Sequence, residues 1–257
     1  MSSTGPRTSI DLNSDLGEGA GTDAELMPLI SSANIACGGH AGDEATMRES
    51  VALARRYGVA VGAHPGYPDR ENFGRVPVEM THDALSEEVA RQIRALRSVD
   101  PDLNISHVKA HGALYNEAWR DKGIAKAIVE GVKRVFTTHT DVALFAPPKS
   151  ALAEAAVHAG LRVVREGFAD RAYEKDGTLR SRQLAGALHT DPKVAARQAL
   201  SFVREGGVRA HDGSFLKMAV DTLCIHGDTP GAPAIAAAVR EALVDAGVKV
   251  RAAIIWQ

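Results

Sequence analysis

The sequence predicts an α/β fold in which strands and helices alternate around a mainly parallel sheet. Short runs of β-branched residues are separated by longer stretches in which apolar residues recur with helical spacing, and this alternation is typical of parallel βα units. The expected strands cover residues 9–13, 33–37, 59–63, 106–110, 142–146, 161–165, 222–226 and 248–255. No linker, low-complexity tract or repeat divides the chain, so we expect one domain over residues 1–257, with 1–7 as a flexible N-terminal tail.

Apolar spacing and capping residues predict where the helices lie. From Leu85 to Leu96, apolar residues recur at intervals of four, four and three residues, which places them on one helix face. Thr81 and Asp191 stand where N-caps belong, and Pro192 follows at a first helical position. The glycines expected to end helices in the left-handed conformation are Gly58, Gly160, Gly207 and Gly247.

The composition excludes several classes of protein. The 257 residues are 45% hydrophobic and carry a net charge of −2, which argues against a disordered chain and against the basic surfaces that bind nucleic acids or membranes. No run approaches the ~18 apolar residues of a membrane span, and the first residues lack a signal-peptide pattern. Cys37 and Cys224 both lie in apolar runs, as in a reducing compartment. We therefore expect a cytoplasmic protein.

Residues capable of catalysis follow nearly every predicted strand. Because sites in parallel α/β folds lie at the carboxyl ends of the strands, one shared pocket is expected there. The strand-end candidates are Asp11, Asn13, Asp15, His40, His64, His111, Glu166, Asp170, His226 and Asp228. Two long polar connections, 66–80 and 167–190, exceed what a minimal loop needs, and connections of this length in a compact domain are often functional.

Four of the ten histidines adjoin glycine or proline at a strand end, which favours contact with substrate or metal. We expect His40, His64, His111 and His226 to point into one pocket. The remaining histidines lack a partner pattern and are interpreted as structural or surface residues: His82, His107, His139, His158, His189 and His211.

The first loop, IDLNSDLGEGAG, supplies carboxylates. Its glycines do not have the spacing of a phosphate loop, so Asp11, Asp15 and Glu18 are better explained as groups that hold a cation or transfer a proton. We expect Asp15 and His111 to be partly solvated cleft residues. Asp43 is predicted equally well as a helix cap and as a site residue.

Lys109 stands two positions before His111, so both side chains face the same side of a strand. An inward-facing lysine needs an anionic partner, and we expect that partner to be the ligand, since the first-loop acids have histidines and backbone amides nearby. Arg70 and Arg171 add further positive charge for a carboxylate or a phosphate. Cys37 lacks a cationic neighbour in the sequence and is interpreted as a buried structural thiol.

Six motifs occur in a fixed order between residues 10 and 228: DLNSDLGEG, SANIACGGHAGD, GAHPGYPD, HVKAHGALYN, FADRAY and CIHGD. Together they resemble the LamB/YcsF family over most of the chain. The sequence departs from the family pattern at Ala110, where proline is expected, and at Val76, where a second arginine is expected.

The resemblance implies an imperfect seven-stranded (β/α) barrel akin to the glycoside hydrolase and deacetylase superfamily. It also implies a subunit of ATP-dependent 5-oxoprolinase, which opens 5-oxo-L-proline to L-glutamate and acts together with subunits B and C. ATP is then a co-substrate, with Mg²⁺ as its expected companion.

The implied reaction needs a base for water, an acid for the leaving amine and cations for phosphoryl and carboxylate oxygens. The residues assigned to catalysis are Asp11, Asp15, Glu18, His40, His64, Lys109, His111 and His226. Those assigned to substrate binding are Asn13, Asp43, Arg70, Tyr115, Asn116, Glu166, Asp170, Arg171 and Asp228.

Two other functions remain open from the sequence. The first is a metal-dependent deacetylase or hydrolase, in which Asp11 or Asp15 with His40 and His64 would bind the metal ion. The second is a non-catalytic subunit that binds substrate for a larger complex. The chain has no nucleotide-binding motif that would locate ATP, and residues 206–218 match no known pattern.

Overall fold

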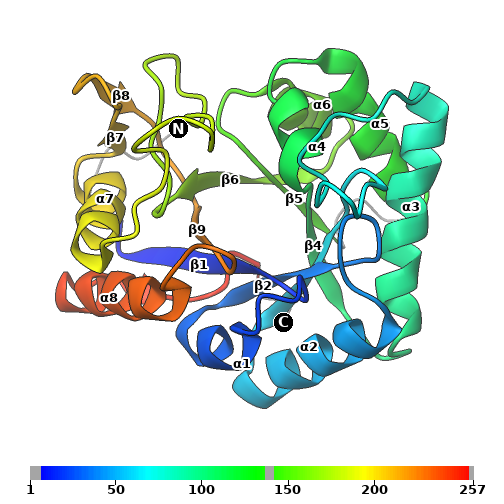
Figure 1. Cartoon of the computed structure of the whole chain (residues 1–257), viewed down its shortest axis with the longest axis horizontal. Coiled ribbons are helices and arrows are strands. Elements are labelled where there is room, and N and C mark those ends of the chain that lie inside the picture. The colour runs from blue at the N-terminus through cyan, green and yellow to red at the C-terminus, as the bar shows by residue number, and fades with distance from the viewer. Residues whose placement is uncertain (1–6, 137–141, 255–257) are drawn as a thin grey trace.

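Seven parallel strands form a closed barrel with helices on its outside (Figure 1). The computed structural model describes residues 7–136 and 142–254. The barrel strands, in order of pairing, are β1 (Ser9–Leu16), β2 (Ser32–Ala36), β3 (Ala60–His64), β4 (Ile105–Lys109), β5 (Ala143–Ala146), β6 (Arg162–Phe168) and β9 (Thr222–His226). Strand β9 pairs with both β6 and β1 and so closes the ring. The predicted α/β barrel is confirmed.

The helices pack their apolar faces against the outside of the barrel, as their spacing predicts. Their bounds are α1 (Asp23–Leu26), η1 (Met27–Leu29), α2 (Glu44–Tyr57), α3 (His82–Ser98), α4 (Gly112–Glu117), α5 (Lys122–Lys133), α6 (Ala151–His158), α7 (Pro192–Arg204) and α8 (Ala232–Asp245). Thr81 caps α3 and Asp191 caps α7, each by accepting a hydrogen bond from a backbone amide of the first turn. In the described chain, no helix is long and apolar enough to cross a bilayer.

Strand β1 is longer than predicted, and this changes where its acidic residues lie. It continues to Leu16, so Asp11, Asn13 and Asp15 all belong to one strand and alternate with residues such as Leu12 of the outer apolar core. Because side chains two positions apart share a face, the three polar residues point into the barrel at successive heights. The predicted strand ended at residue 13 because the polar residues Ser14 and Asp15 that follow resemble the start of a loop.

Near residue 206, the end of α7 and the segment that follows it differ from the prediction. Gly58, Gly160 and Gly247 have positive φ as expected, but after α7 the left-handed residue is Gly206, with a φ of 71°. Gly207 begins β7 (Gly207–Arg209), which pairs antiparallel with β8 (Phe215–Lys217). A Cβ atom at Gly207 would lie 2.1 Å from the Leu216 carbonyl oxygen, so glycine is needed there for close approach of the two strands. Residues 206–218 therefore form a hairpin.

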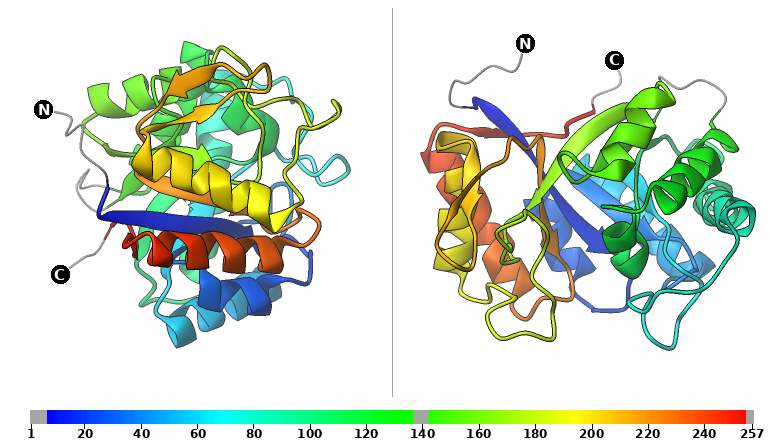
Figure 2. Two further views of the ribbon diagram at one scale, coloured as in Figure 1. Left: turned by 90° about the vertical axis from the view of Figure 1, so that its left-hand side faces the viewer. Right: turned by 90° about the horizontal axis from the view of Figure 1, so that it is seen from above.

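The two ends of the barrel carry different parts of the chain. Figure 2 shows the start of β1 and β10 (Lys249–Val250) at one end, and the loops 66–80 and 167–190 at the other. Strand β10 pairs only with Ser9 and Ile10, so it is much shorter than the predicted strand 248–255, whose last residue lies outside the described chain.

The predicted N-terminal tail is only partly described, because residues 1–6 lie outside the described chain. Arg7 itself belongs to the fold. Its backbone amide donates to the Val203 carbonyl, and its guanidinium pairs with Asp221 at 2.8 Å.

Asp11 lies at the amino end of the barrel, away from the carboxyl ends of the strands where the other candidates gather, so its assignment to catalysis or metal binding is wrong. It accepts hydrogen bonds from Ser31, Ser32 and Thr222 at 2.6, 2.8 and 2.6 Å. Four residues of extended strand, about 13 Å, separate it from Asp15. Burial raises the pKa of Asp11 to about 6, although the three hydroxyl groups oppose this change.

This burial predicts how Asp11 affects the pH dependence of stability. The folded protein holds the Asp11 proton more tightly than the unfolded chain, where the pKa is 3.8, so stability falls as the pH rises from about 4 to about 6. Over this interval the free energy of unfolding of the wild type should fall by about 3 kcal/mol because of Asp11. Asp11→Asn should not show this fall. Urea unfolding of both proteins between pH 4 and pH 7 measures the difference, and identical pH profiles would contradict the assignment.

Candidate functional site

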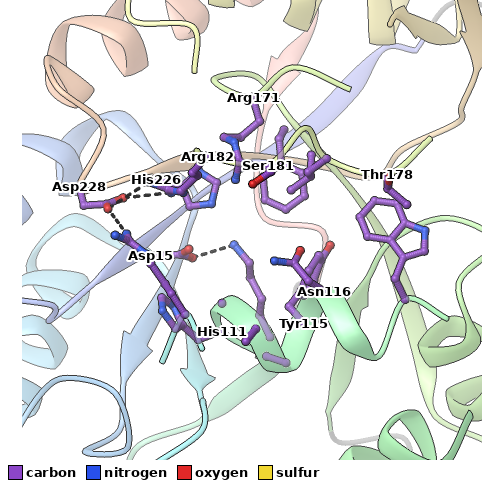
Figure 3. Close-up of a pocket in the computed structure, with 18 of the residues that line it drawn as sticks. Asp15, His111, Tyr115, Asn116, Arg171, Thr178, Ser181, Arg182, His226 and Asp228 are labelled. Carbon is purple, nitrogen blue, oxygen red and sulfur yellow. Dashed lines mark hydrogen bonds and ion pairs between the residues drawn. The ribbon is translucent and has the colours of Figure 1, made fainter. Parts of the chain in front are cut away.

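A cavity of about 420 Å³ lies at the carboxyl end of the barrel (Figure 3). Its walls come from β1, β3 and β4, from α4 and from the loop 167–190, so distant parts of the chain meet there. The predicted site residues that line it are Asp15, Glu18, His64, Lys109, His111, Tyr115, Asn116, Arg171, His226 and Asp228.

Other predicted site residues lie outside the cavity or behind its wall. Asp43 is exposed and caps α2 by accepting a hydrogen bond from the Thr46 amide at 2.9 Å, so its capping role is the one the structure supports. Arg70 is exposed and donates to the Gly42 carbonyl, which corrects its assignment to substrate binding. Completely buried residues support the wall from behind, and these are Asn13, His40, Glu166 and Asp170.

Lys109 is buried in the barrel interior between two carboxylates. Its Nζ lies 2.7 Å from Asp15 Oδ1, 3.1 Å from Glu166 Oε1 and 3.0 Å from Cys224 Sγ. Burial lowers the pKa of Lys109, but attraction by Asp15 outweighs this effect and raises it well above the usual range. The expectation that a ligand supplies the anionic partner is therefore wrong, because the protein supplies it.

Asp15 and His111 are both buried, so the expectation that they are partly solvated is wrong. Only 3% of Asp15 and 6% of His111 are exposed.

Asp15 also accepts a hydrogen bond from Asn34 at 2.8 Å, and Asn34 in turn accepts one from His107 at 2.8 Å. Burial lowers the pKa of His107 to about 3, so this ring is neutral and structural, as expected. The sequence analysis missed Asn34, whose only signal is an amide inside the apolar run SANIA.

Three histidines and Glu18 form a buried cluster beside Asp15. Nδ1 of His111 lies 3.0 Å from Nε2 of His64 and 3.2 Å from Oε1 of Glu18, and the His64 nitrogen lies 3.6 Å from the same oxygen. His40 stacks on His111 with ring centroids 3.6 Å apart, and its Nε2 lies 3.0 Å from Glu18 Oε1. These four residues form one of two groups in the described chain that could hold a metal ion, and neither group includes Asp11.

Backbone encloses this cluster from the loop side. A Cβ atom at Gly66 would lie 2.7 Å from His40 Nδ1, and one at Gly74 would lie 2.7 Å from His40 Cβ and 3.1 Å from His111 Cδ2. Glycine at both positions lets the loop 66–80 pack directly on the two rings. His40 is therefore held behind His111, whereas the other three strand-end histidines line the cavity.

The histidines interpreted as structural or surface residues lie elsewhere. The cavity wall includes none of His82, His107, His158, His189 or His211, within the part of the chain that is described. His139 falls outside the described residues.

His226 and Asp170 form a hydrogen-bonded pair on the other side of the cavity. His226 Nδ1 lies 3.0 Å from Asp170 Oδ2, which also accepts hydrogen bonds from the His226 amide and from the Thr229 hydroxyl. Burial raises the pKa of Asp170, but the His226 charge and these hydrogen bonds bring it down to about 2. The carboxylate thus fixes the orientation of the ring, and Nε2 bonds to no residue of 7–136 or 142–254.

Arginines from the loop 167–190 supply positive charge near His226. Arg171 is held by the Ala187 and Arg180 carbonyls, and burial together with the nearby charge of Arg182 lowers its pKa to about 10. Arg182 pairs with Asp228 at 3.2 Å, and Figure 3 shows both arginines beside His226. The sequence analysis missed Arg182, although the length of the loop indicated a functional role.

Three buried polar atoms at or behind the cavity wall have no hydrogen-bond partner among the described residues. They are the Tyr115 hydroxyl, Oε2 of Glu166 and Nδ1 of His40. Burial and the Glu166 charge raise the pKa of Tyr115 well above its usual range, so the hydroxyl keeps its proton and can donate it in a hydrogen bond.

Comparison with known proteins agrees with this architecture. The family model described as LamB/YcsF family matches residues 10–255. The chain belongs to the LamB/YcsF family.

Family members with curated names share most of their length with this chain. It is 48% identical over 250 residues to the A subunit of 5-oxoprolinase from Chloroflexus aggregans, covering 95% of this chain and 98% of that protein. The corresponding Pyrococcus furiosus protein is 44% identical over 248 residues, with coverages of 94% and 96%.

Two solved structures share the fold. The lactam utilization protein of Thermus thermophilus, at 46% identity, superposes with a TM-score of 0.87 over 95% of this chain and 99% of that one. The uncharacterized protein ATU2773 of Agrobacterium tumefaciens C58, at 15% identity, has a TM-score of 0.59 over 98% and 89% of the two chains, which shows the fold alone.

The position of Lys109 predicts a structural effect of its replacement. Lys109→Met leaves two buried carboxylates without their cation, so the free energy of unfolding should fall by about 3–5 kcal/mol. The control Lys126→Met changes an exposed lysine on α5 and should stay within about 0.5 kcal/mol of the wild type. Chemical denaturation measures both values, and equal stabilities would contradict the structural role of Lys109.

Proposed function

We propose that this chain is the A subunit of an ATP-dependent 5-oxoprolinase, which opens the lactam of 5-oxo-L-proline to L-glutamate while ATP becomes ADP and phosphate. The observation that carries the proposal is that His226, oriented by the buried Asp170, lines the same cavity as Arg171 and Arg182. The names of relatives with nearly full-length similarity support the same reaction. Because the proposed reaction consumes ATP, which is supplied with Mg²⁺, we propose that the protein is located in the cytoplasm.

The stability of a five-membered lactam explains the need for ATP. Ring closure of glutamate is intramolecular, so simple hydrolysis of the lactam is poorly driven. Phosphorylation of the amide oxygen makes the ring carbon electrophilic. One water then adds to this carbon and the C–N bond breaks, which leaves an acyl phosphate, and a second water releases glutamate and phosphate.

The cavity contains groups suited to each step. Nε2 of His226 can accept a proton from the attacking water and return it to the leaving ring nitrogen, because Asp170 stabilises the charged ring. Arg171 and Arg182 can bind phosphoryl or carboxylate oxygens. The Tyr115 hydroxyl, which keeps its proton, can donate a hydrogen bond to the substrate.

The test is reconstitution with the partner subunits. We propose that the chain acts with subunits B and C, so it should co-purify with both and release glutamate from 5-oxoproline only when ATP is present. Absence of glutamate with every combination of subunits would reject the proposal. Binding of 5-oxoproline without turnover in the complete complex would instead indicate a non-catalytic binding subunit.

The proposed role of His226 predicts a selective loss of turnover. His226→Gln in the complete complex should lower kcat by about 10²–10⁴-fold, the usual contribution of a general acid–base group. The melting temperature should change little, because Asp170 keeps its hydrogen bonds from the backbone amide at position 226 and from the Thr229 hydroxyl. His158→Gln, which changes an exposed histidine at the end of α6, is the matched control and should keep full activity. Equal kcat values for the two variants would exclude His226 from catalysis.

A further inference from the structure

The cluster of Glu18, His64 and His111 brings together atoms that all carry lone pairs. The Lys109 carbonyl accepts a hydrogen bond from His64 Nδ1 at 2.8 Å, and the Phe73 carbonyl accepts one from His111 Nε2 at 2.9 Å. Since a carbonyl oxygen only accepts, these two ring nitrogens carry the hydrogens of the neutral rings. The opposite nitrogens, 3.0 Å apart, therefore direct lone pairs toward each other and toward Glu18. Such an arrangement is favourable only when a positive charge lies between the atoms.

We propose that Glu18, His64 and His111 bind a divalent transition-metal ion of the Zn²⁺ type. Ligand bonds of 2.0–2.1 Å in a tetrahedral site place the ligand atoms about 3.3 Å apart. The three separations in this cluster are 3.0, 3.2 and 3.6 Å, so the triangle has the size of one face of such a site. Asp15 Oδ2, 3.4 Å from His64 Nε2, lies at the edge of the same triangle.

The surroundings of the three ligands match what metal sites require. Metal-binding histidines almost always donate their other ring N–H to a carbonyl or carboxylate, and both His64 and His111 do so. His40 has a different role. Its ring is parallel to that of His111, with an interplanar angle of 2°, so an ion in the plane of one ring lies outside the plane of the other. His40 is a positioning residue that hydrogen bonds to Glu18.

A second group of candidate ligands, Asp15, Cys224 and His226, does not suit a cation. The Lys109 ammonium lies 2.7 Å from Asp15 and 3.0 Å from Cys224, so a metal ion there would meet a positive charge. Glu18, His64 and His111 all line the cavity, which leaves one side of the proposed site facing a bound ligand. The inference goes beyond the proposed function, because metal binding depends on neither the substrate nor the partner subunits.

The experiment uses the full chain after treatment with a chelator. Isothermal titration with Zn²⁺ and with Mn²⁺, followed by metal analysis after dialysis, should show one tightly bound ion per chain. His40→Ala should weaken binding roughly 10–100-fold, as loss of an outer hydrogen bond does, and His111→Ala and Glu18→Gln should weaken it more. The control His226→Gln changes a histidine in the same cavity and should keep the wild-type affinity.

Two results would overturn the proposal. One is the absence of binding by the folded wild-type chain, which would mean that a shared proton fills the cluster. The other is an unchanged affinity in His111→Ala and Glu18→Gln. Co²⁺ bound to the wild-type chain provides a readout that needs no variant, since a four-coordinate site with nitrogen ligands gives strong visible absorption. Metal binding is measured on the isolated chain and without 5-oxoproline or ATP. The metal proposal can therefore be rejected while the proposed function stands, and the proposed function can be rejected while the metal proposal stands.

Discussion

The ion pair at the centre of the barrel is the constraint on which the rest of the site depends. The Lys109 ammonium joins Asp15 of β1 to Glu166 of β6, two strands that do not pair with each other. A charge buried this deeply is tolerated only with close partners, so the interior of the barrel must be polar at this height. Asn13 and Asn34 complete the network by hydrogen bonding to these carboxylates. Most of the apolar core lies between the strands and the surrounding helices.

Asp15 connects two chemically different halves of the cavity. On one side it lies near His64 and the Glu18 cluster, where lone pairs converge. Across the cavity, His226 is held by a carboxylate beside arginines, which suits proton transfer and anion binding. Asp15 lies in β1, and Glu18 follows two residues after the end of that strand. A shift of β1 would therefore disturb both halves of the cavity together.

The sequence predicted the barrel and most of the cavity wall because helix spacing and strand-end residues are local signals. It misplaced Asp11 because the predicted strand ended at residue 13 and not at Leu16, which brought Asp11 too close to the carboxyl end of the barrel. It assigned Lys109 to a ligand because a sequence does not show that Glu166, 57 positions later, faces the same barrel interior. Arg182 and Asn34 were missed for a similar reason, since their partners are distant in the chain.

The glycines of the loop 66–80 determine how the His40–His111 stack can be reached. Gly66 and Gly74 place backbone against the rings, and the Phe73 ring packs edge-on against both histidines, so the loop covers this side of the stack. Among the described residues, the open side of the cluster is the one on which Glu18, His64 and His111 face the cavity. Any group held between Glu18 and the histidines must enter before the molecule that fills the cavity, and it can leave only after that molecule has gone. The barrel therefore imposes an order of binding by shape alone.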